Sequence, residues 1–141
     1  MNVRILTLPP LLGLSLGIAV VALSLPAGAA PLLRCQVSYA GTTHVVEARP
    51  VADPYPVPSV DIGGRFRFKA VMVGDAAQVD RVLLYAYLDT RKQPILIHEA
   101  KYLPPFQVST APYLLTGKQH LYAGPVEREL IYSCTLQGVA P

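Results

Sequence analysis

From residue 30 onwards the sequence contains none of the short motifs that identify a catalytic centre. No serine of this part lies in a Gly-x-Ser-x-Gly elbow, and no histidine belongs to a His-x-His or Glu-x-x-His pair. Most aspartates adjoin glycine or proline or end a predicted strand, where this residue commonly serves turns. We therefore expect a protein that is not an enzyme and that holds no cofactor.

The chain also lacks a large excess of either positive or negative charge. Charged residues make up 15% of the chain, and the net charge is +3. The first 29 residues hold Arg4 and no acidic residue, so the remainder carries 11 basic residues against nine acidic ones, a net charge of +2. A balance this mild does not by itself indicate a nucleic acid or a membrane surface as the partner.

Only one stretch of the chain is long and apolar, and it lies at the amino end. Leu11 to Leu25 is apolar apart from small residues, but at about 15 residues it is shorter than the roughly 20 that a membrane-spanning helix needs. Pro26-Ala27-Gly28-Ala29 follows with the small-x-small pattern of a signal peptidase site. We predict a signal peptide over residues 1–29 and a periplasmic or secreted domain over residues 30–141, with no stable membrane span after processing. An uncleaved membrane anchor is the alternative.

The chain has only two cysteines, Cys35 and Cys134, one near each end of the predicted mature domain. Each lies in a segment, residues 32–39 and residues 129–137, where apolar side chains take alternate positions, as in a strand with one buried face. Two cysteines in an exported chain of this size predict one disulfide, which would join the first strand to the last. Closing a loop of about 100 residues stabilises a fold by up to roughly 4.7 kcal/mol in the chain-entropy model. Two free buried thiols are the alternative.

Short apolar segments separated by glycine and proline fill the rest of the domain, and they predict strands rather than helices. Residues 79–89 also fit helical spacing, but their β-branched and aromatic content favours a strand that is covered on both faces. The prolines from Pro50 to Pro58 exclude a helix or a central strand and predict an extended connection over the surface. The predicted strands are residues 32–39, 43–49, 65–73, 79–89, 95–102, 118–123 and 128–136, with 106–110 as a short edge strand, 111–117 as a loop and Gly124 to Glu127 as a hairpin connection.

This order of elements predicts an all-β fold, a small antiparallel β-sandwich of about seven strands. Tyr132-Ser133-Cys134 has the Tyr-x-Cys spacing of the tyrosine corner, which is similar to the immunoglobulin domains. The chain has no tryptophan, however, and only seven residues follow Cys134, too few for the strand that comes next in that family. The expected fold is therefore immunoglobulin-like in architecture only.

Three histidines follow the predicted leader: His44, His98 and His120. Imidazole is the commonest ligand for zinc and copper, so a metal site could form from these residues with Glu47 or Glu99. The histidines lie 54 and 22 residues apart, and His98 suits a hydrogen-bonded histidine at the edge of the core. We predict no metal ligands, and a periplasmic metal-handling domain using the three histidines is kept as the alternative function.

Two features suggest a binding surface instead. On an extended strand Arg65, Arg67 and Lys69 project from one face about 6–7 Å apart, which suits a row of phosphates or carboxylates. Tyrosines outnumber phenylalanines by eight to three, and Tyr55 and Tyr102 lie near prolines. Tyrosine provides contact area at a low entropy cost and carries a polar tip, so such residues can form binding loops. A solvated outer face and tyrosines that cap the core are the alternatives.

These residues together predict an exported, non-enzymatic binding or structural domain that contacts a protein or an anionic component of the cell envelope. Nucleic acid is not expected as a partner, because no array of base-stacking side chains accompanies the basic residues.

Overall fold

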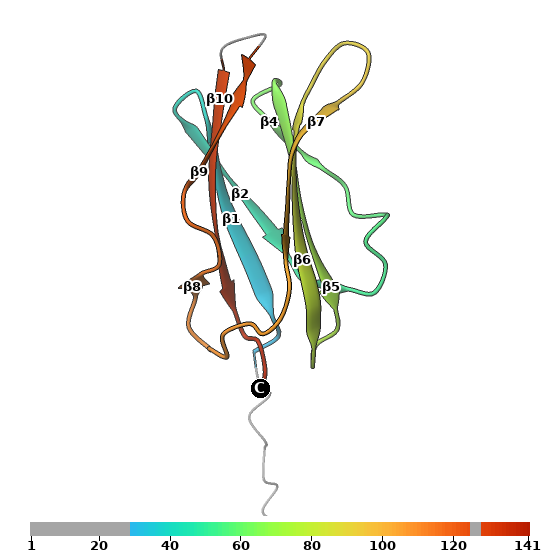
Figure 1. Cartoon of the computed structure of the whole chain (residues 1–141), viewed down its shortest axis with the longest axis vertical. Coiled ribbons are helices and arrows are strands. Elements are labelled where there is room, and N and C mark those ends of the chain that lie inside the picture. The colour runs from blue at the N-terminus through green and yellow to red at the C-terminus, as the bar shows by residue number, and fades with distance from the viewer. Residues whose placement is uncertain (1–28, 125–127) are drawn as a thin grey trace, which may run out of the picture.

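The computed structural model describes residues 29–124 and 128–141, and its ten strands form two packed sheets (Figure 1). The predicted all-β sandwich is confirmed. The predicted signal peptide lies outside the described residues except for Ala29, and so do three of the four residues of the predicted Gly124–Glu127 connection. Among the described residues, no helix is long and apolar enough to cross a membrane.

The first sheet contains both ends of the domain, and we call it the terminal sheet. Its strand order is β2-β1-β10-β8, with β9 also paired to β10, and every pairing in it is antiparallel. Its strands are β1 (Leu32–Tyr39), β2 (Thr42–Ala48), β8 (Tyr113–Leu114), β9 (Gln119–Ala123) and β10 (Arg128–Gln137).

The second sheet, which we call the central sheet, has the order β3-β5-β6-β7, with β4 also paired to β5. The pairing of β3 with β5 is parallel, and the others are antiparallel. Its strands are β3 (Pro50–Val51), β4 (Val60–Ile62), β5 (Phe66–Gly74), β6 (Val79–Leu88) and β7 (Ile95–Tyr102).

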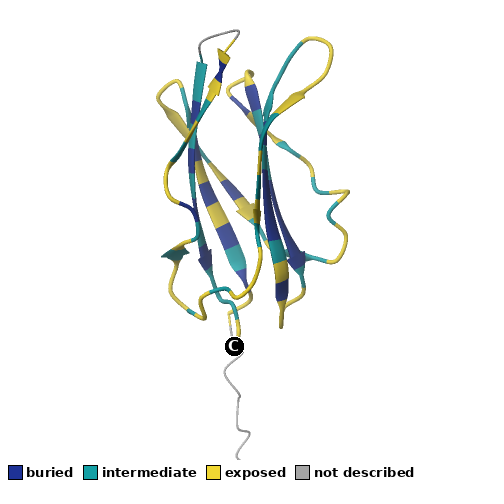
Figure 2. Ribbon diagram, viewed as in Figure 1, coloured by how far each residue is buried: buried dark blue, intermediate teal, exposed yellow. Residues whose placement is uncertain are grey.

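The core lies between the sheets, where alternate side chains of each strand meet. On β1 and β10 every second residue is buried and the residues between are more exposed, which gives the banded ribbons of Figure 2. This is the period of two that the sequence predicted for both cysteine-containing segments. The inward residues of these two strands are Leu33, Cys35, Val37, Leu130, Tyr132, Cys134 and Leu136.

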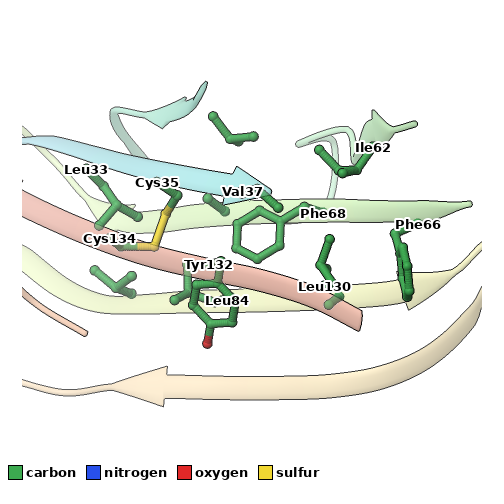
Figure 3. Packing of buried hydrophobic residues seen from close by; sticks show 14 of the residues in the cluster. Leu33, Cys35, Val37, Ile62, Phe66, Phe68, Leu84, Leu130, Tyr132 and Cys134 are labelled. Carbon is green, nitrogen blue, oxygen red and sulfur yellow. A yellow bond between two sulfur atoms is a disulfide. The ribbon is translucent and has the colours of Figure 1, made fainter. Parts of the chain in front are cut away.

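The predicted disulfide is present: Cys35 and Cys134 are directly opposite each other on β1 and β10, with their Cα atoms 4.0 Å apart (Figure 3). The backbone explains this closeness. The Cys134 N–H donates to Thr116 Oγ1 at 3.0 Å, and its carbonyl accepts from the Leu115 N–H at 2.9 Å, so both groups point away from β1. Cys35 and Cys134 thus form a non-hydrogen-bonded pair, the type in which antiparallel strands bring side chains closest.

Residues 79–88 form strand β6, so the helical alternative for this segment is wrong. Val82, Leu84 and Ala86 are fully buried towards the core, and Leu83 is buried on the opposite face. A second cluster, made by Val71, Val73 and Leu83, lies on that outer face and is covered by side chains of the segment that follows β2. The prediction of a strand covered on both faces is therefore confirmed for this part of β6.

Three short strands were not predicted from the sequence, and the prediction of one other strand is wrong. Strands β3, β4 and β8 have two or three residues each, too few to show a pattern, and β8 lies in the predicted 111–117 loop. Phe106 to Thr110, the predicted edge strand, contributes only an isolated bridge between Ser109 and Val139. Its chain runs between the two sheets at the lower end of the molecule in Figure 1.

Candidate functional site

The outer face of the central sheet carries a row of side chains set by strand register. Because the alternate residues of β5 are buried in the core, the residues between them point outwards. Lys69 on β5 is opposite Tyr85 on β6, and Tyr85 is opposite Glu99 on β7. Arg67 is opposite Tyr87 in the adjacent row. Tyr85 therefore lies between a cation and a carboxylate, and Tyr87 lies opposite a second cation.

A groove of about 380 Å³ lies over this face. Its floor is formed by β5 and β6, and its wall is formed by the tip of the proline-rich segment between β2 and β4, which arches away from the sheet at the right of Figure 1. The rings of Tyr85 and Tyr87 are stacked along β6 with centroids 6.4 Å apart and planes inclined by 28°. The lining residues are Pro54, Tyr55, Lys69, Val71, Arg81, Leu83, Tyr85 and Tyr87.

The proline-rich segment is anchored at both of its ends. Val51 and Val57 pack on the outer cluster of Val71, Val73 and Leu83, which buries apolar surface that the sheet would otherwise expose. Between these anchors the Tyr55 N–H donates to Asp53 Oδ1 at 3.0 Å, an Asx-type turn at the tip of the segment. Tyr55 is 89% exposed, so its side chain lies beside the groove and does not pack in the core.

The groove carries positive charge that the fold does not neutralise. Among the ion pairs of the described residues, none includes Lys69 or Arg81. Burial raises the pKa of Tyr85, and the nearby Glu99 carboxylate raises it further, so this phenol stays neutral and can donate a hydrogen bond. The groove offers the ammonium group of Lys69 and the guanidinium group of Arg81 beside neutral aromatic rings. This arrangement suits an anionic ligand with some apolar surface.

The structure brings together only part of the predicted basic row. Lys69 lines the groove, but Arg67 is held by its own chain: its guanidinium donates to Ser59 Oγ at 2.8 Å and to the Ser59 carbonyl at 3.1 Å, and lies 3.8 Å from Asp89. Arg65 does not belong to the strand. It is the last residue of the turn that it forms with Gly63 and Gly64, both of which have a φ of 65°. The prediction that Arg65 continues the strand alternation of β5 is therefore wrong.

The two predicted tyrosines lie on different faces of the central sheet. Tyr55 is at the groove, whereas Tyr102 is the last residue of β7, opposite the buried Val82, and packs against the core. Burial raises the pKa of Tyr102. Tyr102 is thus a strand residue facing inwards rather than part of an exposed loop, and the structure does not join it to Tyr55. The charged and aromatic groove residues that the sequence prediction missed are Arg81, Tyr85 and Tyr87.

The three histidines occupy separate environments. His98 on β7 hydrogen-bonds through Nε2 to the Tyr132 hydroxyl at 2.8 Å, across the sandwich, and burial lowers its pKa. Its predicted hydrogen bond at the core edge is confirmed. His120 Nδ1 lies 2.5 Å from Glu129 Oε1 on the outer face of the terminal sheet, and His44 lies on β2. Within residues 29–124 and 128–141, no three histidine, cysteine, aspartate or glutamate side chains are grouped as metal ligands.

A bulge interrupts the side-chain alternation of β7. The pairing of β6 with β7 shifts between Ala86 and Tyr87, so His98 is opposite Ala86 but Leu96 is opposite Tyr87. Leu96 therefore faces outwards beside the groove-lining Tyr87, not inwards with His98 as strict alternation would have it.

Comparisons with protein-family models, curated proteins and solved structures found no match to this chain.

Proposed function

We propose that this protein is an exported, non-enzymatic binding domain that holds an anionic component of the cell envelope in the groove between the proline-rich segment and the β5–β6 face. One observation carries the proposal: Lys69 and Arg81, which have no ion-pair partner among the described residues, line the same groove as the stacked rings of Tyr85 and Tyr87.

The two kinds of side chain have different roles in this account. Lys69 and Arg81 attract phosphate, sulfate or carboxylate groups, and this attraction weakens as salt concentration rises. Tyr55, Tyr85 and Tyr87 offer rings that lose little side-chain entropy on binding and that can lie against a sugar ring or an acyl chain. The groove, at about 380 Å³, is near the small end of ligand sites, so it fits one segment of a longer molecule.

The test compares two double variants with equal charge. Lys69→Ala/Arg81→Ala removes both cations of the groove, whereas Arg91→Ala/Lys92→Ala removes two exposed cations from the β6–β7 connection. Binding is measured against a sulfated polysaccharide, against phosphatidylglycerol vesicles and against envelope extract. We expect the groove variant to bind at least about fivefold more weakly than the wild type, and the control variant to bind within about twofold of it.

Equal binding by the two double variants would remove the groove from the account, because net charge alone would then explain the interaction. Tyr55→Ala gives a separate test of the aromatic contribution. Its side chain is almost fully exposed, so its removal should weaken binding without changing the free energy of unfolding. No observation of this kind favours the metal-handling alternative.

A further inference from the structure

Strand β7 forms one border of the central sheet and, among the described residues, pairs only with β6. Its inward side chains, His98, Ala100 and Tyr102, are only half-buried, although the residues opposite them on β6 are fully buried. Ile95 and Leu96 at its start are 50% and 48% exposed. The outer edge of β7 therefore presents backbone donors and acceptors that pair with no other described strand. In β-augmentation another strand pairs with an edge of this kind.

The charges on this edge are self-complementary. Glu99 and Lys101 both point outwards, opposite Tyr85 and Leu83, and both are exposed. If a second copy of β7 pairs antiparallel about a two-fold axis through Ala100, each Glu99 lies opposite the Lys101 of the other copy. Two neighbouring registers also keep outward side chains opposite outward side chains. The register centred on residue 99 places Glu99 opposite Glu99, and the register centred on residue 101 places Lys101 opposite Lys101. Only the register centred on Ala100 pairs opposite charges.

We propose that two copies of this domain associate edge to edge through β7 in that register, which makes the two central sheets one continuous sheet. The pairing is short, because the bulge next to Ile97 limits it at one end and Pro104 at the other. The two-fold axis is perpendicular to the sheet, so the two β5–β6 grooves face the same side. A long anionic molecule could then occupy both grooves, which raises its apparent affinity without a new contact.

Sedimentation velocity over a series from low to high micromolar protein tests this association. We expect a concentration-dependent dimer of the wild type. Glu99→Lys and Lys101→Glu should each weaken it about tenfold, because one substitution places like charges opposite each other at both symmetry-related positions. The double variant Glu99→Lys/Lys101→Glu restores opposite charges in the same register, so it should dimerise within about twofold of the wild type.

Three results would overturn the proposal: a wild type that stays monomeric throughout the series, single variants that dimerise as the wild type does, or a double variant as weak as the singles. Amide hydrogen exchange gives a second measurement on the unmodified protein. Exchange of the β7 amides should slow as protein concentration rises, while amides of β2, an edge strand of the terminal sheet, should not change. The outcome does not depend on whether the groove binds an anion.

Discussion

Removal of the Cys35–Cys134 bond by the double substitution Cys35→Ala/Cys134→Ala should destabilise the domain severely. The cysteines are 99 residues apart in the sequence, so the bond closes a loop that includes nearly all of the described chain. For a loop of that length the chain-entropy model gives about 4.7 kcal/mol at 25 °C. Single domains are stable by only about 5–15 kcal/mol in total, so the variant should retain a small fraction of the wild-type free energy of unfolding.

The assay is urea denaturation followed by far-ultraviolet circular dichroism. Both sulfurs are fully buried, so the alanine variant also loses packing contacts. Wild-type protein unfolded and refolded in a reductant separates the two effects, because it lacks the cross-link but keeps the sulfur atoms. We expect the reduced protein to lose most of the 4.7 kcal/mol and the variant to lose somewhat more. A loss below about 1 kcal/mol in both samples would contradict this expectation, since the cross-link would then restrict the unfolded chain very little.

Two further predictions concern polar groups at the core. Thr116→Val should lower the free energy of unfolding by about 1–3 kcal/mol in urea denaturation, because the buried N–H of Cys134 loses its acceptor. Thr116→Ser keeps the hydroxyl and should lower the free energy of unfolding much less. Equal losses in the two variants would show that this hydrogen bond does not contribute to stability. The pKa of His98 is lowered in the folded state by burial, so the unfolded chain takes up a proton near pH 6.5 before the folded protein does, and stability should fall as the pH drops below about 6.5. His98→Gln should make the melting temperature less dependent on pH in that range, and an unchanged pH profile would contradict this assignment.

The sequence predicted the fold well where burial alone determines the side-chain pattern. In β1 and β10 one face meets the core along the whole strand, so the alternation of apolar residues indicates both the strand and its buried face. The pairing of the cysteines was predicted from their number, since the chain has only two. Strands β3 and β8 have two residues each and exist because a neighbouring strand offers backbone partners. Pairing of that kind depends on tertiary structure and leaves no period in the sequence.

The groove was harder to predict than the fold. Its sequence signal was partly visible in Tyr55 and Lys69, but Tyr85 and Tyr87 fell within a segment interpreted as a buried strand. That interpretation holds for Leu83, which the proline-rich segment covers, but Tyr85 and Tyr87 are only half-buried. The hydrogen bond from Arg67 to Ser59 likewise depends on β4 lying beside β5, which the sequence did not predict.

A nuclear magnetic resonance titration of the domain with a sulfated oligosaccharide tests whether the β5–β6 face is the binding surface. We expect the largest amide shift changes around Tyr55, Lys69, Arg81, Tyr85 and Tyr87, and we expect these changes to diminish as salt is added. Shift changes centred on His120 and Glu129 of the terminal sheet, or spread evenly over all exposed cations, would contradict this prediction.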